Sequence, residues 1–147
     1  MRVVVQRVKE ASVKVNEQLV SKIGKGYVLL VGFHHLDDVK DIQYMAKKIK
    51  KLRIFSDDQG QMNLNIDQVQ GEILSVSQFT LYGDVKKQNR PGFTEAMPYE
   101  KANRFYQQFL DDLSKQGLHV KDGIFGENMQ VSLVNDGPVT LLVETKH

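Results

Sequence analysis

Two short segments of the sequence contain residue types that could take part in chemistry. Ser77-Gln78-Phe79-Thr80 places two hydroxyl groups and a carboxamide at the end of an apolar run. At such a position, side chains and backbone N–H groups can converge on a ligand. More often, however, this pattern marks only the end of an ordinary strand. Asn135-Asp136-Gly137-Pro138 has the composition of a hairpin turn, because Asn, Asp and Gly tolerate the required φ and Pro can begin an edge strand.

Signatures of common hydrolases, nucleotide-binding proteins and metal sites do not occur in the sequence. There is no Gly-x-Ser-x-Gly motif and no P-loop, and without cysteine there is no thiol nucleophile. None of the histidines, His34, His35, His119 and His147, belongs to a metal-binding His-x-x-x-His or Glu-x-x-His pair. The adjacent His34 and His35 are expected to point to opposite faces of a strand. The sequence therefore predicts neither a metal site nor a cofactor.

The composition is that of one folded domain covering residues 1–147. With 147 residues and 41% hydrophobic content, the chain should bury about two thirds of the surface that it exposes when unfolded. The absence of cysteine excludes a disulfide framework, and no leader is recognisable before Arg2. The longest apolar run, Tyr27 to Val31, is far too short to span a bilayer. We therefore expect a cytoplasmic protein without a membrane partner.

The net charge gives little indication of a nucleic-acid partner. Its formal value of +2 is small, and short basic clusters are more typical of solvated surfaces than of phosphate-binding sites. Two such clusters occur, one made of Lys47, Lys48, Lys50 and Lys51 and the other of Lys86, Lys87 and Arg90.

Strands dominate the elements that must position these residues. Arg2–Lys9, Ser12–Val15 and Leu19–Ile23 predict a meander of short strands. The nearly continuous apolar run Tyr27–Phe33 predicts a central strand that is buried on both faces. Further strands are expected at Arg53–Phe55, Glu72–Ser77, Met129–Val134 and Val139–Glu144, the last two forming a hairpin around the segment from Asn135 to Pro138.

Two helices interrupt the strands. Asp37 or Asp38 should cap the first, whose apolar residues recur every three or four positions up to Leu52. Pro98 fits the first turn of the second, which should end at Gly117. The sequence thus predicts an α+β domain with a mainly antiparallel sheet or partial barrel and two packed helices. Residues 83–94 lack periodicity and are expected to form a surface loop.

Both chemically suggestive segments resemble the signature motifs of a known family. Ser77 to Leu81 and Asn135 to Thr140 look like the two motifs of the D-aminoacyl-tRNA deacylases. The resemblance covers nearly the whole chain and includes Met1-Arg2, Val5 to Val8, Ala11 to Val13, Leu52 to Phe55, Met62-Asn63, Arg90-Pro91, Phe93-Thr94, Phe125-Gly126 and Met129 to Val131. Departures occur at Gly83, where the family has alanine, at Gly92, where it has a small hydroxyl residue, and in the loop from Lys86 to Asn89.

The resemblance implies a homodimer whose active sites lie at the subunit interface. A cis Gly137-Pro138 pair would reach into the partner's pocket, which is built around Ser77 to Thr80. Its carbonyl oxygens would bind the substrate amino group and exclude an L side chain, whereas glycine would be admitted. The substrates would be D-aminoacyl-tRNA and mischarged glycyl-tRNA, and Arg7 would hold the inserted segment.

The same resemblance assigns roles around the ester. Thr80 has been regarded as a nucleophile in this family, but no His, Lys or carboxylate adjoins it in sequence to activate it. We therefore favour attack by water, assisted by the ribose 2′-hydroxyl, with backbone N–H groups near Phe79 and Thr80 stabilising the oxyanion. Gln78 and Ser77 would orient the substrate, and Phe79 and Met129 would contact it. Lys86, Lys87 and Arg90 would contact the tRNA.

Two other functions remain open at this point. A non-catalytic RNA-binding or proofreading-accessory module could keep the fold and use the pocket only for binding, although the intact motif residues argue against it. A general small-molecule esterase is disfavoured because the sequence contains no recognisable triad.

Overall fold

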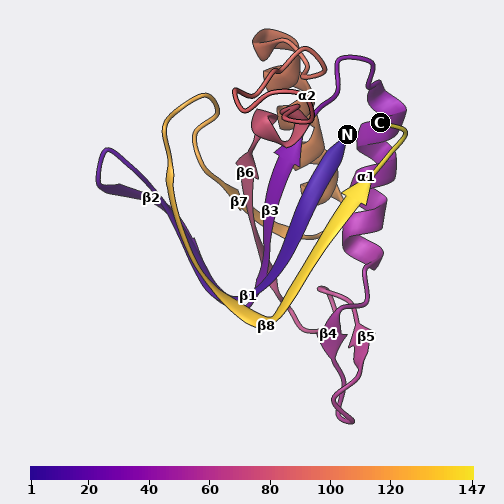
Figure 1. Ribbon diagram of the computed structural model, residues 1–147. Coiled ribbons are helices and arrows are strands. Elements are labelled where there is room, and N and C mark those ends of the chain that lie inside the picture. The colour runs from indigo at the N-terminus through magenta and orange to yellow at the C-terminus, as the bar shows by residue number, and fades with distance from the viewer.

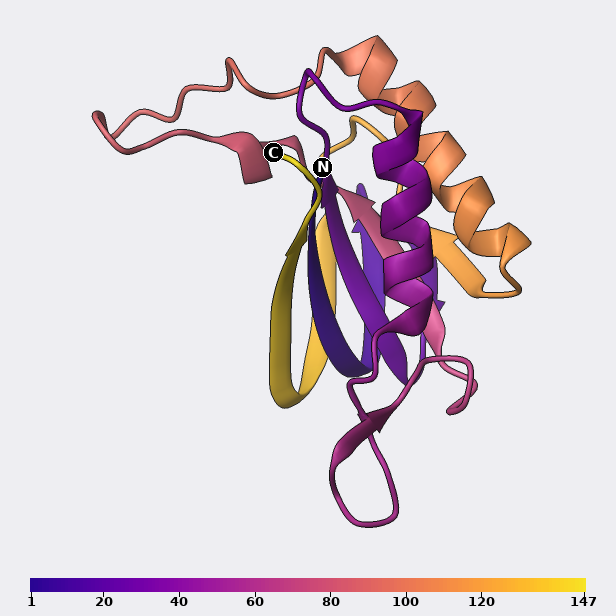
Figure 2. The same cartoon turned by 90° about the vertical axis from the view of Figure 1, so that its right-hand side faces the viewer.

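The computed structural model describes residues 1–147 as one α+β domain in which two helices cover one face of a curved, nearly barrel-shaped sheet (Figure 1, Figure 2). Six strands form the sheet in the order β2-β1-β3-β6-β7, with β8 also paired to β1. The small hairpin β4-β5 projects from the main body (Figure 1). The elements are β1 (Arg2–Val15), β2 (Gln18–Ile23), β3 (Gly26–Gly32), α1 (Val39–Lys51), β4 (Phe55–Ser56), β5 (Met62–Leu64), β6 (Glu72–Ser77), the 3-10 helix η1 (Phe79–Tyr82), α2 (Tyr99–Lys115), β7 (His119–Asp122) and β8 (Gln130–Glu144).

The sheet is mixed: most of its strand pairs are antiparallel, as predicted, but it also contains parallel pairs that were not expected. β1 runs antiparallel to β2, β3 and β8, whereas β3 is parallel to β6 and β6 to β7. The parallel pairs arise because α1 connects β3 to β6 and α2 connects β6 to β7, and parallel neighbours require such crossovers. The prediction that β3 is central and buried on both faces is confirmed.

Two expected groups of short strands are continuous long strands instead. β1 extends without a break over 14 residues, so the predicted division of this segment into two strands is wrong, whereas the predicted strand Leu19–Ile23 is present as β2. β8 extends over 15 residues, so the predicted C-terminal hairpin is wrong. Both halves of β8 pair with β1, from Val131 opposite Val13 to Val143 opposite Val3, with register shifts in between. The central residues of β8 pair irregularly with β1, with shifts in register. The strand therefore bends there but does not reverse its direction. The Gly137-Pro138 peptide within this bend is cis.

The helices agree with their predicted positions because local signals fix their ends. The Asp38 carboxylate accepts hydrogen bonds from the backbone N–H groups of Lys40 and Asp41 and so caps α1. Pro98 precedes the first residue of α2, which ends before Gly117. The buried stripes of both helices pack against the sheet in one core cluster that includes Ile42, Met45, Ile49, Tyr106, Phe109 and Leu113. Each fully buried large apolar side chain contributes about 1.5 to 3 kcal/mol.

The β4-β5 hairpin was only partly anticipated. The predicted strand Arg53–Phe55 lies at Phe55–Ser56, and its partner β5 was not predicted. The three residues of β5 include the polar Asn63 and the exposed Met62, and they lack an alternating apolar pattern, so the sequence contains no strand signal there.

No helix of the protein has the length and apolar composition of a membrane span.

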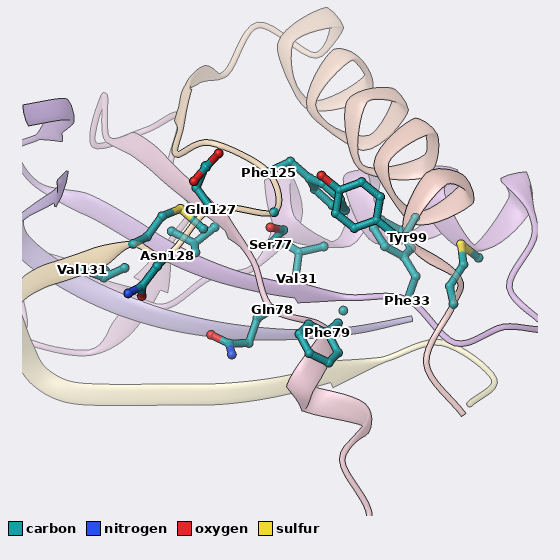
Figure 3. A pocket seen from close by; sticks show the side chains of 16 residues that line it. Val31, Phe33, Ser77, Gln78, Phe79, Tyr99, Phe125, Glu127, Asn128 and Val131 are labelled. Atoms are coloured by element: carbon teal, nitrogen blue, oxygen red, sulfur yellow. The ribbon is translucent and has the colours of Figure 1, made fainter. Parts of the chain in front are cut away.

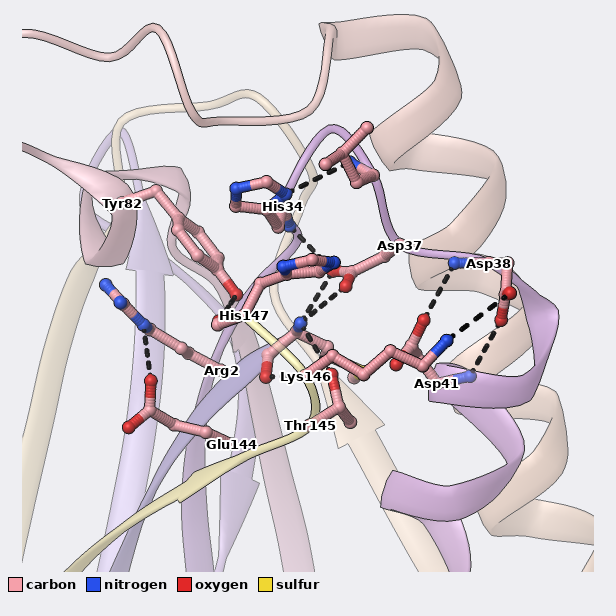
Figure 4. A network of polar contacts seen from close by, with 12 residues as sticks. Arg2, His34, Asp37, Asp38, Asp41, Tyr82, Glu144, Thr145, Lys146 and His147 are labelled. Carbon is pink, nitrogen blue, oxygen red and sulfur yellow. Dashed lines mark hydrogen bonds and ion pairs between the residues drawn. The ribbon is translucent and has the colours of Figure 1, made fainter.

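The two ends of the chain meet beside α1 (Figure 4). The Met1 ammonium group is buried and lies 2.7 Å from Asp37, and it also donates to the Thr145 hydroxyl. The expectation that His34 and His35 point to opposite faces is wrong, because β3 ends at Gly32 and the two rings stack at 4.4 Å. Burial, together with the neighbouring imidazoles, lowers the pKa of His34.

Candidate functional site

A pocket of about 500 Å³ opens at the carboxyl ends of the parallel strands β3 and β6 (Figure 3). Such crevices are common ligand sites in sheets with crossover connections. Its walls come from β3, the end of β6, the beginning of α2 and the loop before β8, and they are mostly apolar. The lining includes Val31, Phe33, Ser77, Gln78, Phe79, Met97, Tyr99, Ala102, Phe125, Glu127, Asn128, Met129 and Val131.

The backbone turn after β6 presents the polar rim of this pocket. β6 pairs with β3 as far as Ser77, and the Gln78 N–H then donates to the Val31 carbonyl at 2.7 Å. The chain next enters the single turn of η1, which exposes Phe79 and Thr80. Of the predicted site residues, Ser77, Gln78, Phe79 and Met129 line the pocket, whereas Thr80 lies on η1 outside the lining.

The surroundings of Thr80 do not provide a base. Its hydroxyl accepts a hydrogen bond from the Gln78 side-chain amide, and no His, Lys or carboxylate side chain is hydrogen-bonded to it. An amide N–H cannot take up the proton that a nucleophilic hydroxyl must lose. The arrangement therefore suits Thr80 for orienting Gln78 better than for attacking an ester.

Sequence reasoning identified Met129 in the loop before β8, but not the other residues that this loop and α2 bring to the pocket. Tyr99 and Phe125 pack edge to face at 5.1 Å and form the wall opposite Gln78 (Figure 3). Glu127 belongs to the same loop. Gly126 has φ +82°, and a β-carbon there would lie 2.3 Å from the Tyr99 hydroxyl, so glycine permits the loop to close onto Tyr99. The turn from Gly123 to Gly126 was the one sequence feature that could have indicated this loop.

A buried pair of hydroxyl groups, on Tyr106 and Ser75, connects two of the elements that form the pocket. The Tyr106 hydroxyl on α2 donates to the Ser75 hydroxyl on β6 at 3.0 Å, and both side chains are buried. Burial raises the pKa of Tyr106 and also that of the nearby Asp122. The pair links the helix that carries Tyr99 to the strand that carries Ser77.

Gly137 and Pro138 lie away from the pocket of their own chain, and neither lines it. Arg7 is 8% exposed and donates to the carbonyls of Asp136 at 2.9 Å and Ile54 at 2.6 Å, so it anchors the backbone directly before Gly137. On β3, Arg7 pairs with Tyr27 and Ser77 pairs with Val31. Tyr27 and Val31 are four residues apart, which corresponds to about 13 Å along the strand.

Lys86, Lys87 and Arg90 lie on an extended segment, residues 84–92, which we term the basic finger. Asp84 and Gly92 close its base with two backbone hydrogen bonds, and the finger projects from the domain (Figure 2). All three basic side chains are exposed. Next to the base, Phe93 packs on Phe79 of the pocket at 5.0 Å. A β-carbon at Gly83 would lie 3.0 Å from the Thr80 carbonyl oxygen and 3.1 Å from Phe93, so glycine allows close packing there.

No group of three or more His, Cys, Asp or Glu side chains is arranged to hold a metal ion. His34 stacks on both His35 and His147, but these rings do not form such a group. What the pocket offers to a substrate is hydrogen-bonding groups on its rim and apolar walls.

Comparison with known proteins defines the class as hydrolases of the aminoacyl-tRNA ester bond. The model of the family described as D-Tyr-tRNA(Tyr) deacylase matches residues 4–144, and the chain belongs to this family. Proteins named D-aminoacyl-tRNA deacylase from Bacillus cereus (strain AH187) and Staphylococcus carnosus (strain TM300) are each 54% identical over 146 residues, covering 99% of this chain and 100% and 97% of theirs.

Solved structures agree with the fold. One described as c-Myc DNA Unwinding Element Binding Protein has a TM-score of 0.94 and 45% identity, with full coverage of both chains. Another, described as a probable eukaryotic D-amino acid tRNA deacylase, has a TM-score of 0.84 at 17% identity over 97% of each chain, which supports the fold alone.

Proposed function

We propose that this protein hydrolyses the ester bond of D-aminoacyl-tRNA, and of mischarged glycyl-tRNA, and leaves L-aminoacyl-tRNA intact. The observation that carries the proposal is the position of Ser77, Gln78 and Phe79 on the rim of a pocket, in a chain matched by the deacylase family over residues 4–144. The cytoplasm is where we expect the protein to act, because charged tRNA is found there.

The shape of the pocket suits the end of a charged tRNA. The polar rim at Ser77 and Gln78 would face the ester, and the aromatic wall of Tyr99 and Phe125 would contact the terminal base, since unpaired bases stack on aromatic side chains. The phosphates of the preceding nucleotides would then meet Lys86, Lys87 and Arg90 on the basic finger, which joins the pocket through Phe93 and Phe79.

The chemistry that we propose uses water as the nucleophile. The first N–H groups of a helix have no partner within it, so those of Phe79 and Thr80 at the start of η1 are suited to hold the developing oxyanion. Gln78 would orient the ester, and the ribose 2′-hydroxyl would assist the attack. The absence of a base beside Thr80 supports this mechanism over a covalent one.

Chiral selection requires a second copy of the chain in this scheme. Gly137 and Pro138 do not line the pocket of their own chain, so they would act on the pocket of a partner subunit. Backbone oxygens presented there would contact the substrate only as far as its α-carbon. Such a filter would accept many D side chains and would admit glycine, while an L side chain would collide with it.

The principal alternative is a module that binds nucleic acid without cleaving it. One structural relative is described as binding a DNA element, and the basic finger would attract the phosphates of DNA as well as those of tRNA. Hydrolysis separates the two functions, because a binding module would leave the ester intact.

The decisive assay compares matched D- and L-aminoacyl-tRNA. Loss of ester from D-tyrosyl-tRNA and from glycyl-tRNA should exceed the spontaneous rate, whereas L-tyrosyl-tRNA should decay at the spontaneous rate. Release of labelled amino acid gives the rates, and Gln78→Ala provides an inactive control because it removes the amide from the rim. Binding of all three substrates without accelerated hydrolysis would support the alternative.

Replacing Thr80 with alanine should leave most of the activity. The Thr80 hydroxyl contacts Gln78 and has no base, so its loss should lower the single-turnover rate by about tenfold or less, the usual scale for one neutral hydrogen bond of about 0.5 to 1.5 kcal/mol. A covalent mechanism predicts nearly complete loss. An acyl group trapped on Thr80 and identified by mass spectrometry would overturn the water mechanism.

A further inference from the structure

η1 needs support beyond its own sequence, because a helix of 4 residues has too few internal hydrogen bonds to fix its direction. The strand end holds its beginning through the hydrogen bond from Gln78 N–H to the Val31 carbonyl. Its other end, at Leu81 and Tyr82, is held by residues from the two termini of the chain (Figure 4).

Arg2 contacts η1 in two ways and links it to β8. Its Nη1 donates to the Leu81 carbonyl at 2.9 Å, and its guanidinium carbon lies 4.5 Å from the centre of the Tyr82 ring. Its Nε donates to Glu144 at 2.8 Å. A planar group with several donors can make these contacts together, whereas the single ammonium group of lysine cannot.

Tyr82 fixes the same end from inside. It is 2% exposed, and its hydroxyl donates to the His147 carbonyl at 2.9 Å. The Tyr82 ring meets His34 edge to face at 5.4 Å, and His34 stacks on His147 at 4.3 Å. The last residue of the chain is therefore packed against the base of η1.

We propose that Arg2 and Tyr82 are positioning residues that hold η1 so that Gln78, Phe79 and Thr80 keep the geometry required for ester hydrolysis. This inference rests on the proposed function of those three residues. Neither Arg2 nor Tyr82 lines the pocket, so neither should contact the substrate. The Arg2 side chain is 31% exposed and its ion pair with Glu144 lies at the surface, where such pairs contribute little to stability. We therefore expect replacement of Arg2 to lower the rate of hydrolysis more than the stability of the fold.

Arg2→Lys and Tyr82→Phe test the proposal. Each should lower kcat for D-aminoacyl-tRNA by about tenfold while KM changes by less than about threefold, because small misplacements of catalytic groups slow the chemical step more than they weaken binding. Thermal unfolding measured in parallel should show folded proteins. Tyr82→Phe removes one hydroxyl from a buried ring, so it remains informative even if Arg2→Lys proves unstable.

Matched controls come from the same chain. Arg53→Lys alters an arginine that binds the backbone carbonyl of Asn63 on the β4-β5 hairpin, and Tyr27→Phe removes a hydroxyl that donates to the Leu52 carbonyl from another buried ring. Both should retain the wild-type kcat. Equal losses in test and control variants, or wild-type kcat in both test variants, would overturn the positioning role. A wild-type protein inactive on D-aminoacyl-tRNA would instead overturn the proposed function on which that role depends.

Discussion

A D-aminoacyl-tRNA whose terminal ribose carries hydrogen in place of the 2′-hydroxyl should be hydrolysed about a hundredfold to a thousandfold more slowly than the normal substrate, the scale for losing one well-placed group that stabilises a transition state. No base is hydrogen-bonded to Thr80, whose hydroxyl contacts only the Gln78 amide. The 2′-hydroxyl is vicinal to the ester and already close to it, which gives it the entropic advantage of an intramolecular group. Single-turnover rates measure the effect.

Binding must be measured alongside the rate. The deoxy substrate should compete with normal D-aminoacyl-tRNA nearly as well as the normal substrate does, because the aromatic wall and the basic finger do not require the missing group. A substrate with the 2′-deoxy change at the penultimate nucleotide is the matched control and should be cleaved normally. Cleavage of the terminal deoxy ester within a few-fold of the normal rate would show that a protein group performs this step.

Arg7→Ala should lower D-aminoacyl-tRNA hydrolysis by about a hundredfold, because a misplacement of about 1 Å in a substrate-positioning segment can have that effect. The substitution removes both donors that hold the carbonyls of Asp136 and Ile54, so the bend at Gly137 loses its anchor. The ratio of D to L hydrolysis should fall as well. Arg7→Lys, which can reach only one carbonyl, should lie between the wild type and Arg7→Ala, and circular dichroism should show that both variants are folded.

Mixing subunits tests whether the bend acts on a partner. Arg7→Ala keeps its pocket but loses its filter, whereas Gln78→Ala keeps its filter but loses its pocket. If the two variants are refolded together, random pairing should restore about a quarter of the wild-type activity, since half of the dimers are mixed and each has one complete site. No recovery, or an active monomer, would contradict a site shared between subunits.

The parts of the fold that local chemistry dictates were predictable from the sequence. The cap at Asp38 and the apolar stripe after it determine α1, and the continuous apolar run after Gly26 determines a central strand. The parallel pairing of β6 with β3 and β7, and the continuity of β8, were not predictable. The composition of residues 135–138 fits a tight turn and a bend in one strand equally well, and only pairing of both flanks with β1 distinguishes them.

The candidate site shows the same division. Ser77, Gln78 and Phe79 were identified because they are adjacent in sequence, and Met129 through the resemblance to the family; all four line the pocket. Tyr99 and Phe125 were missed as pocket residues because they are distant from Ser77 in sequence, and only the packing of α2 and the loop before β8 brings them to the pocket. Convergence of residues that are distant in sequence is a property of the tertiary fold.

The bend in β8 has a consequence for aggregation of the protein. β8 pairs with β1 alone, so its 15 residues border the sheet on one side without a neighbouring strand. A long, regular border of this kind is a template on which strands of other molecules can accumulate into aggregates. Pro138 lacks the N–H that such a template needs, and the register shifts of β8 interrupt its regularity. The bend should thus limit aggregation through this edge of the sheet.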